Sequence, residues 1–295
     1  MHTLRSWRAL FVREYLEHRI AFLWFPLGIV ALLALSIIAA FGFQRIRVEP
    51  FFLPEAMKVY EVGYLALLGF WLAYLAIALF FYFGDAFNAD RRNNAMFFWK
   101  SMPVTDLKIL ASKFLSGWTV FPLVIFVIAM VTGLMFYVAV TAAAWVLPGF
   151  GLLNPMTALG AFVQITLFGL IYYALTLLWY APFFAWVGGL SSVFGRWSLP
   201  LAFVIPGLLA VIENISFFGS GPVGGYVAQY LGYRAQFGLS DADYTLMVMN
   251  SLPFDAGLFT SRVLASVDWT QMAIGLVFSG AVIWLASEYR RRRIV

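Results

Sequence analysis

The chain has no cysteine and only two histidines, His2 and His18, among its 295 residues. It can therefore form neither a disulfide nor a thiolate-ligated metal site. Both histidines lie near the N-terminus without a second ligand at metal spacing, so we expect no metal site and no histidine-based catalytic triad. A phosphate-binding loop of the Gly-x-x-x-x-Gly-Lys-Ser/Thr type is also missing. We expect a protein that is not an enzyme and has no catalytic residue or cofactor of its own.

Charge is equally scarce. Only 11% of the residues are charged, whereas 63% are hydrophobic and 19% aromatic. So few charges cannot cover the surface of a soluble globule of this length, and the main solvent of the chain must be lipid. The net charge of +5 comes from basic residues clustered in particular loops, which is typical of membrane topology rather than of nucleic-acid binding. We expect lipid contact and no nucleic-acid partner.

Apolar runs recur along the whole chain. A helix needs about 20 apolar residues to cross a bilayer core of roughly 30 Å. Six runs meet this length, at 20–43, 62–83, 114–147, 156–187, 199–218 and 269–287. The sequence therefore predicts an all-α polytopic protein, with residues 1–295 forming a single transmembrane domain of six spans.

The basic residues also predict an orientation. An N-terminus in the cytoplasm leaves only five basic residues outside, at 45, 47, 58, 234 and 262. The other 14 of the 19 fall inside, at 5, 8, 13, 19, 91, 92, 100, 108, 113, 196 and 290–293. Because cytoplasmic loops are enriched in lysine and arginine, we expect both termini in the cytoplasm and the protein in the cytoplasmic (inner) membrane.

Residues 1–19 precede the first run and favour an interfacial helix. Leu4, Trp7, Phe11 and Tyr15 recur at helical spacing, and the arginines lie off that stripe. Glu14 and His18 fall near the stripe and blur the pattern.

Residues 85–113 join the second and third runs on the cytoplasmic side. Arg91 and Arg92 precede an apolar cluster that includes Phe97, Phe98 and Trp99, and Lys100 and Pro103 follow. Proline interrupts a helix, and a new helix is predicted to start at Thr105 or Asp106 and to run through Lys113. An apolar cluster between cations is unfavourable in water, so it should insert into lipid headgroups or into a pocket on a partner. The alternative is a charged loop that only enforces topology.

Polar residues inside the runs are few. Glu213 and Asn214 lie in the outer half of the fifth run, and they either form an outer gate or pathway or satisfy backbone groups near a helix end. Gln164 and Thr166 are interpreted as interhelical hydrogen-bonding groups. The outer segment 219–268 is too long for a structureless loop, so we expect short helices that cap the outer end of the bundle.

The chain resembles the type-2 (ABC-2) permease subunits of ATP-binding-cassette exporters. WRALFVREYLEHRIAFLWFPL, at 7–27, is similar to the amphipathic elbow helix of that family. FFWKSMPVTDLKILASKFL, at 97–115, is similar to its serine-x-proline stretch, short helix and lysine, here Ser101, Pro103, Asp106 and Lys113. Six spans, a large cytoplasmic loop and a long outer segment extend the resemblance over nearly the full length.

This resemblance implies a half-transporter. A second permease chain, identical or similar, would pair with this one, and both would dock on separate ABC ATP-binding subunits that hold ATP and magnesium. Residues 85–113 would be the coupling loop and Arg196 would lie in a lesser contact. The expected coupling residues are Arg91, Arg92, Phe97, Phe98, Trp99, Lys100, Pro103, Asp106, Lys113 and Arg196. The cargo, lipid-like, amphipathic or peptide, would leave outward.

Two alternatives stay open. One keeps the ATPase partner but moves no cargo, and transmits motion through residues 219–268 to an extracytoplasmic protein. The other is a secondary carrier or channel, which Glu213 would serve.

Overall fold

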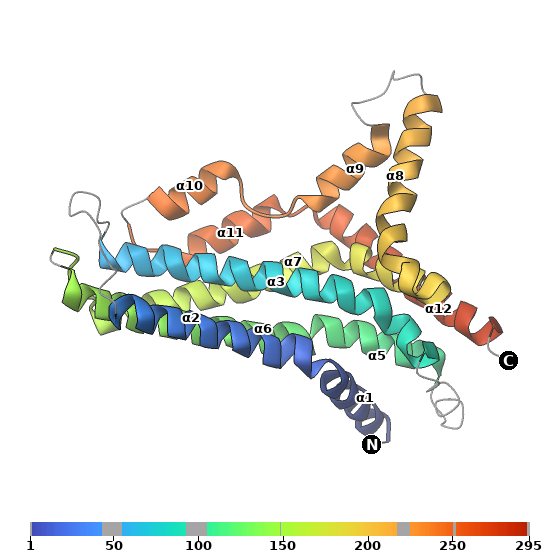
Figure 1. Ribbon diagram of the computed structural model, residues 1–295. Helices are drawn as coiled ribbons and strands as arrows, with labels where there is room; N and C mark the ends of the chain where they lie inside the picture. The colour runs from blue at the N-terminus through green and yellow to red at the C-terminus, as the bar shows by residue number, and fades with distance from the viewer. Residues whose placement is uncertain are drawn as a thin grey trace.

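The computed structural model describes residues 2–42, 55–92, 105–147, 149–216, 225–249 and 252–293, and within these ranges it is helical without a strand (Figure 1). The helices are α1 (His2–Arg19), η1 (Ile20–Trp24, a π-helix), α2 (Phe25–Gly42), α3 (Ala56–Arg92), α5 (Asp106–Trp118), α6 (Val120–Val146), α7 (Pro155–Phe194), η3 (Gly195–Trp197, a 3-10 turn), α8 (Ser198–Ser216), α9 (Gly225–Ala235), α10 (Asp241–Met249), α11 (Ala256–Ser266) and α12 (Trp269–Arg293).

Five helical stretches in the described ranges are long and apolar enough to cross a membrane, which makes the chain a multi-pass membrane protein. They are Arg5–Gly42, Ala56–Asp90, Asp106–Val146, Pro155–Ser216 and Trp269–Arg292. The six predicted runs become five stretches because the fourth and fifth follow each other without a gap. The separate sixth span stays a prediction.

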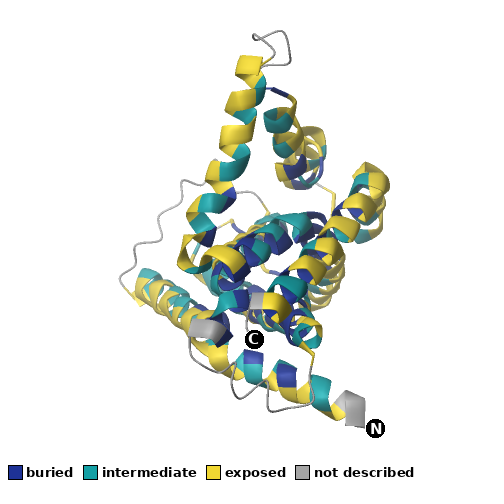
Figure 2. Ribbon diagram, turned by 90° about the vertical axis from the view of Figure 1, so that its right-hand side faces the viewer, coloured by how far each residue is buried: buried dark blue, intermediate teal, exposed yellow. Residues whose placement is uncertain are grey.

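The junction of α7 and α8 explains this merger. Residues 188–198, which separate the fourth and fifth predicted runs, are mostly helical, because α7 continues to Phe194 and only Gly195–Trp197 separates it from α8. Gly195 adopts φ +58°, a conformation that suits glycine and ends α7. The Ser198 hydroxyl donates to the Gly84 carbonyl at 2.6 Å and fixes the start of α8 on α3. Beyond this anchor α8 rises steeply from the bundle with mostly exposed residues (Figures 1 and 2).

Helix α3 is the centre of the core. Its buried side chains recur every three or four residues, which is the period of one helix face: Tyr60, Tyr64, Leu68, Trp71, Leu75, Leu79 and Phe83. Trp71 Nε1 donates to Thr132 on α6 at 3.0 Å, and Tyr64 shares a 2.8 Å hydrogen bond with Thr166 on α7. The predicted interhelical role of Thr166 is thereby confirmed. These bonds and the apolar face hold α3, α6 and α7 together.

Two prolines mark bends in the long stretches. Pro26 cannot donate to the carbonyl four residues earlier, and the π-helix η1 occupies that turn between α1 and α2. Pro122 has the same effect on the turn where α5 gives way to α6 at Thr119. Helix α1 is present as predicted, and its position on the membrane surface stays a prediction.

The outer segment contains the predicted short helices, α9, α10 and α11, but α11 packs on α7 and α9 packs on α8 instead of capping the end of the bundle (Figure 1). Ala235 accepts a hydrogen bond from Tyr180 at 2.6 Å, and the Ala256 N–H donates to Gln164 at 3.2 Å. The second bond agrees with the interhelical role predicted for Gln164. Since residues 180 and 164 are about four turns apart on α7, the segment follows that helix over roughly 24 Å.

Candidate functional site

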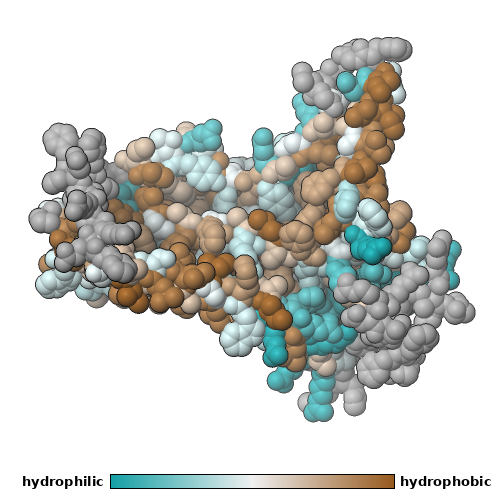
Figure 3. Space-filling view, in the orientation of Figure 1, coloured by the Kyte–Doolittle hydropathy of each residue, from teal (hydrophilic) through white to brown (hydrophobic). Residues whose placement is uncertain are grey.

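Both ends of the chain lie at the same end of the bundle as the junction between α3 and α5 (Figure 1). Hydrophilic surface gathers near this end, whereas the side of the bundle and α8 are largely hydrophobic (Figure 3). Helices α1, α3, α5 and α12 meet here around charged side chains. We call Glu14, Asp90, Lys113 and Arg290, with Arg13 and Asp106 at the edge, the ion cluster.

Lys113 of α5 occupies the middle of the ion cluster. Its side chain is 0% exposed, and its Nζ lies 2.9 Å from Glu14 Oε1 of α1 and 3.6 Å from Asp90 Oδ1 of α3. The lysine meets both carboxylates at ion-pair distance without an aligned hydrogen bond. A buried ammonium group needs such partners because its desolvation otherwise costs several kcal/mol. Lys113 therefore joins α5 to both α1 and α3.

Asp90, at the last buried turn of α3, has three cations around it. Arg13 of α1 donates to its Oδ1 at 3.0 Å, and Arg290 of α12 lies 3.5 Å from its Oδ2. Arg290 is 4% exposed and also lies 3.7 Å from Asp106 at the start of α5. Among the described residues, Asp90 thus meets three cations, and Arg13 also pairs with Glu17 at 2.7 Å. Removing the only close cation of a buried carboxylate typically costs about 3–5 kcal/mol.

The buried face of α1 differs from the predicted apolar stripe. Glu14 is 2% exposed and lies on the side of α1 that contacts the bundle, where it accepts a 3.0 Å hydrogen bond from Tyr82. The ring of His18 packs edge-on against Tyr82 with 4.8 Å between centroids. The two residues that blur the stripe in the sequence therefore face the ion cluster.

Glu14, Glu17 and His18 also lie close enough to surround a metal ion, but Lys113 already neutralises Glu14.

The structure describes some of the predicted coupling residues but not all of them. Phe97, Phe98, Trp99, Lys100 and Pro103 lie outside the described residues. Arg91 and Arg92 end α3, and their side chains are also outside the described part.

The structure describes the three remaining members of the predicted coupling set, Asp106, Lys113 and Arg196. The predicted start of α5 is confirmed, because Thr105 caps it by accepting from the Lys108 N–H at 3.3 Å and Asp106 is its first residue. Lys113 is buried in the ion cluster rather than exposed to a partner. Arg196 is exposed in the turn between α7 and α8.

Glu213 lies far from the ion cluster, near the end of α8. Its two carboxylate oxygens accept from the backbone N–H groups of Tyr226 and Val227 at 2.9 and 2.8 Å. Unpaired N–H groups at a helix start favour such an acceptor, so Glu213 caps α9 and ties the end of α8 to the start of α9. This agrees with the prediction that it satisfies backbone groups near a helix end. Asn214 is exposed beside it.

Arg234, at the end of α9, is a buried cation that no sequence pattern singled out. It is 2% exposed, and its guanidinium lies 4.1 Å from the ring centroid of Trp179 on α7. Its Nη2 donates to the Trp179 carbonyl at 2.8 Å. At the adjoining start of α12, Asp268 accepts from the Gln271 N–H, and this hydrogen bond is the main cause that lowers the pKa of Asp268. Arg234 Nη1 also donates to the Gln271 carbonyl at 3.4 Å, so this arginine fastens the end of α9 to both α7 and α12.

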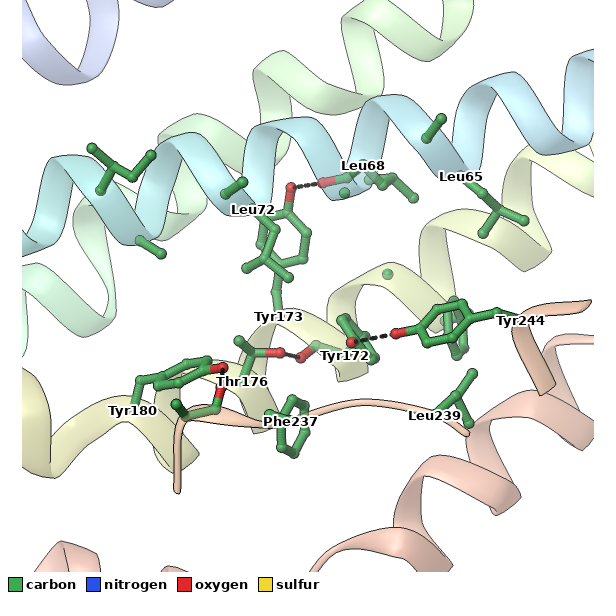
Figure 4. A pocket seen from close by; sticks show the side chains of 18 of the residues that line it. Leu65, Leu68, Leu72, Tyr172, Tyr173, Thr176, Tyr180, Phe237, Leu239 and Tyr244 are labelled. Carbon is green, nitrogen blue, oxygen red and sulfur yellow. Dashed lines mark hydrogen bonds between the residues drawn. The ribbon is translucent and has the colours of Figure 1, made fainter. Parts of the chain in front are cut away.

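A cavity of about 830 Å³ opens between α3, α7 and the segment 235–248 (Figure 4). Its floor is formed by buried residues such as Leu68 and Tyr173, and its rim by exposed residues such as Ile77 and Phe203. The described residues that line it include no charged side chain. No pattern in the sequence pointed to this cavity, because its walls come from segments distant in the chain, chiefly 62–80, 168–184 and 235–248.

No family model, curated protein or solved structure matches this chain. The likeness to ABC-2 permeases therefore remains a resemblance in the sequence. The ion cluster, the cavity and the arrangement of the helices are the features of this chain that point to its function.

Proposed function

We propose that this chain is the membrane-spanning permease subunit of an ATP-driven ABC exporter, and that a separate ATPase subunit hydrolyses ATP with its own magnesium. A second permease chain, identical or similar, would complete the transporter. In this proposal the segment between α3 and α5 receives motion from the ATPase, and the helices carry it across the membrane.

The ion cluster is the observation that supports this proposal most. Residues 93–104 connect α3 to α5, and the two helix ends that flank them are joined through Asp90 and Lys113. Glu14 and Arg290 extend the connection to α1 and α12. A force on the connecting segment would therefore move four helix ends as one unit instead of bending a single loop. Buried cores transmit displacement in this way because they are close-packed.

Burial of the ion pairs gives the linkage its stiffness. Glu14, Asp90, Lys113 and Arg290 are shielded from water, and neighbouring members lie at ion-pair distance, so separating two of them leaves charges in a medium of low polarity. Exposed ion pairs contribute only about 0–1 kcal/mol and would not hold helices against an applied force. The burial of Lys113 and Asp90 supports a mechanical role for this junction over a loop that merely fixes topology.

The test uses the full chain purified in mild detergent from its native membrane with its partners. We expect an ABC-type ATPase subunit, identified by mass spectrometry, and ATP hydrolysis in the same preparation. The variants Phe98→Asp and Trp99→Asp place a charge in the apolar cluster of the connecting segment and should reduce ATPase association at least tenfold. Met249→Asp is the matched control, because Met249 is 79% exposed on the outer segment and away from the ion cluster.

Two outcomes would contradict the proposal. A preparation without any ATP-hydrolysing subunit would exclude an ABC permease. Equal ATPase association in Phe98→Asp, Trp99→Asp and Met249→Asp would exclude the connecting segment as the coupling element.

The secondary-carrier alternative loses support because Glu213 is engaged by two backbone N–H groups. The cavity favours cargo transport over the alternative in which no cargo moves, because it offers space for a bound molecule.

A further inference from the structure

The cavity between α3, α7 and the segment 235–248 lies at the depth of the membrane-spanning helices and opens to the side of the bundle. Its lining combines a wall of small residues on α3 with aromatic residues on α7. Ala66, Gly69 and Ala73 are exposed on one face of α3, and a Cβ atom added to Gly69 would have no neighbour within 4 Å. A smooth wall without a packing partner leaves room for a straight hydrocarbon chain. The volume of about 830 Å³ falls within the roughly 300–1,000 Å³ typical of small-molecule sites.

The hydroxyl groups of the cavity are the features that select a ligand (Figure 4). Three of them donate to backbone carbonyls: Tyr173 to Leu68, Thr176 to Tyr172 and Tyr180 to Ala235. The other two, Tyr172 of α7 and Tyr244 of α10, share one hydrogen bond of 3.1 Å. Two hydroxyls carry two protons and this bond uses one. The pair can therefore donate its second proton to an oxygen of a bound molecule.

The uncharged character of the described lining restricts the chemistry of the ligand further. The described lining has no cation that could neutralise a carboxylate or a phosphate. The nearby Arg234 is not part of the lining, because its guanidinium is held by the Trp179 ring and carbonyl. An anionic group in this apolar cavity would lose its hydration without compensation, whereas an ester or amide carbonyl needs only one donor.

We infer that the cavity binds a neutral amphiphile, with its alkyl chain along the small-residue wall of α3 and its ester, amide or hydroxyl oxygen at the Tyr172–Tyr244 pair. The molecule enters sideways from the bilayer past the exposed rim at Ile77 and Phe203. As a site for transported cargo this inference rests on the proposed function. As a binding site it stands on the cavity alone.

The experiment uses the full chain in lipid nanodiscs without any ATPase. The probe is a monoacylglycerol with a photoreactive diazirine in its acyl chain, and the comparison probe is the same acyl chain as a free carboxylate. After irradiation, mass spectrometry locates the labelled residues. We expect the monoacylglycerol to label the cavity lining of α3, α7 and α10 above the general level of lipid-facing residues.

Three variants make the test specific. Gly69→Leu fills the cavity without a clash and should reduce labelling of the lining at least about fivefold. Gly160→Leu is the matched control, because Gly160 is exposed on α7, outside the cavity, and also has no neighbour within 4 Å; labelling should not change. The double variant Tyr172→Phe/Tyr244→Phe removes both hydroxyls, and with them the donor to the ligand, and should lower the preference for the monoacylglycerol about 2- to 10-fold, the effect of one hydrogen bond.

Each contrary result overturns a stated part of the inference. Equal labelling in Gly69→Leu and the unmodified chain would mean that only annular lipid is detected. Crosslinks between two copies through the cavity, without lipid labelling, would make it an interface between chains. A preference for the carboxylate probe in the unmodified chain would refute a neutral ligand. Because no ATPase is present, all these failures are distinguishable from a failure of the proposed function.

Discussion

Replacing Lys113 with methionine tests whether the ion cluster holds the helix ends together. Methionine keeps the length and apolar stem of the side chain but removes the ammonium group. Asp90 would retain Arg13 at 3.0 Å and Arg290 at 3.5 Å, whereas Glu14 would lose its cation at 2.9 Å while remaining about 2% exposed. An uncompensated buried carboxylate costs about 3–5 kcal/mol. Since 1.4 kcal/mol corresponds to a factor of ten, opening of α5 should increase roughly 100- to 4,000-fold.

The absence of cysteine provides a direct assay. A single cysteine introduced as Leu110→Cys, at a position 0% exposed on α5, reports opening through its rate of thiol labelling. We expect labelling to accelerate by about two to three and a half orders of magnitude in Lys113→Met, and Glu14→Gln in the same chain to recover most of this change. The control is Arg291→Met, because Arg291 is 73% exposed in its pair with Glu288 and an exposed pair contributes about 0–1 kcal/mol.

The reasoning fails if Lys113→Met and Arg291→Met label at the same rate, because burial would then confer no extra strength on the pair. It also fails if Glu14→Gln slows labelling equally in the presence and absence of Lys113. That result would show that the two residues do not interact, whatever their distance.

Three further predictions concern packing, capping and the buried arginine. Gly133→Ala should destabilise the fold by about 1–3 kcal/mol in reversible unfolding, because its Cβ would overlap the Tyr64 ring, whereas the Cβ of Gly160→Ala would have no neighbour within 4 Å and should leave the stability unchanged. Glu213→Ala should increase hydrogen exchange at the start of α9 several-fold by removing a cap of about 0.5–2 kcal/mol, and unchanged exchange would argue against the capping role. Arg234→Lys should lower the thermal unfolding temperature although charge is kept, because lysine cannot place a planar guanidinium over the α7 tryptophan and on its carbonyl together; an unchanged temperature would count against that role.

The sequence predicted much of the helical framework because its signals are local. Apolar runs and helix caps involve neighbouring residues, so the start of α5 at Thr105 and Asp106 was predicted correctly. The outer segment was likewise recognised as helical from its length and composition. Its position along α7 could not be predicted, because it depends on contacts such as Tyr180 with Ala235, 55 residues apart.

The ion cluster could not be read from the sequence for the same reason. Glu14, Asp90, Lys113 and Arg290 each stand beside an apolar stretch, where a charge normally marks the edge of the membrane. The one local sign was Glu14, which interrupts the apolar stripe of α1 and in the structure faces Lys113.

The sequence by itself determined that this chain is a helical membrane protein and showed where its basic residues are concentrated. Both follow from composition and short-range periodicity. Only the tertiary structure decided which charges meet, how α8 leaves the bundle and where a cavity remains. Those features depend on the packing of helices distant in the chain, and packing selects among arrangements that the same local pattern allows.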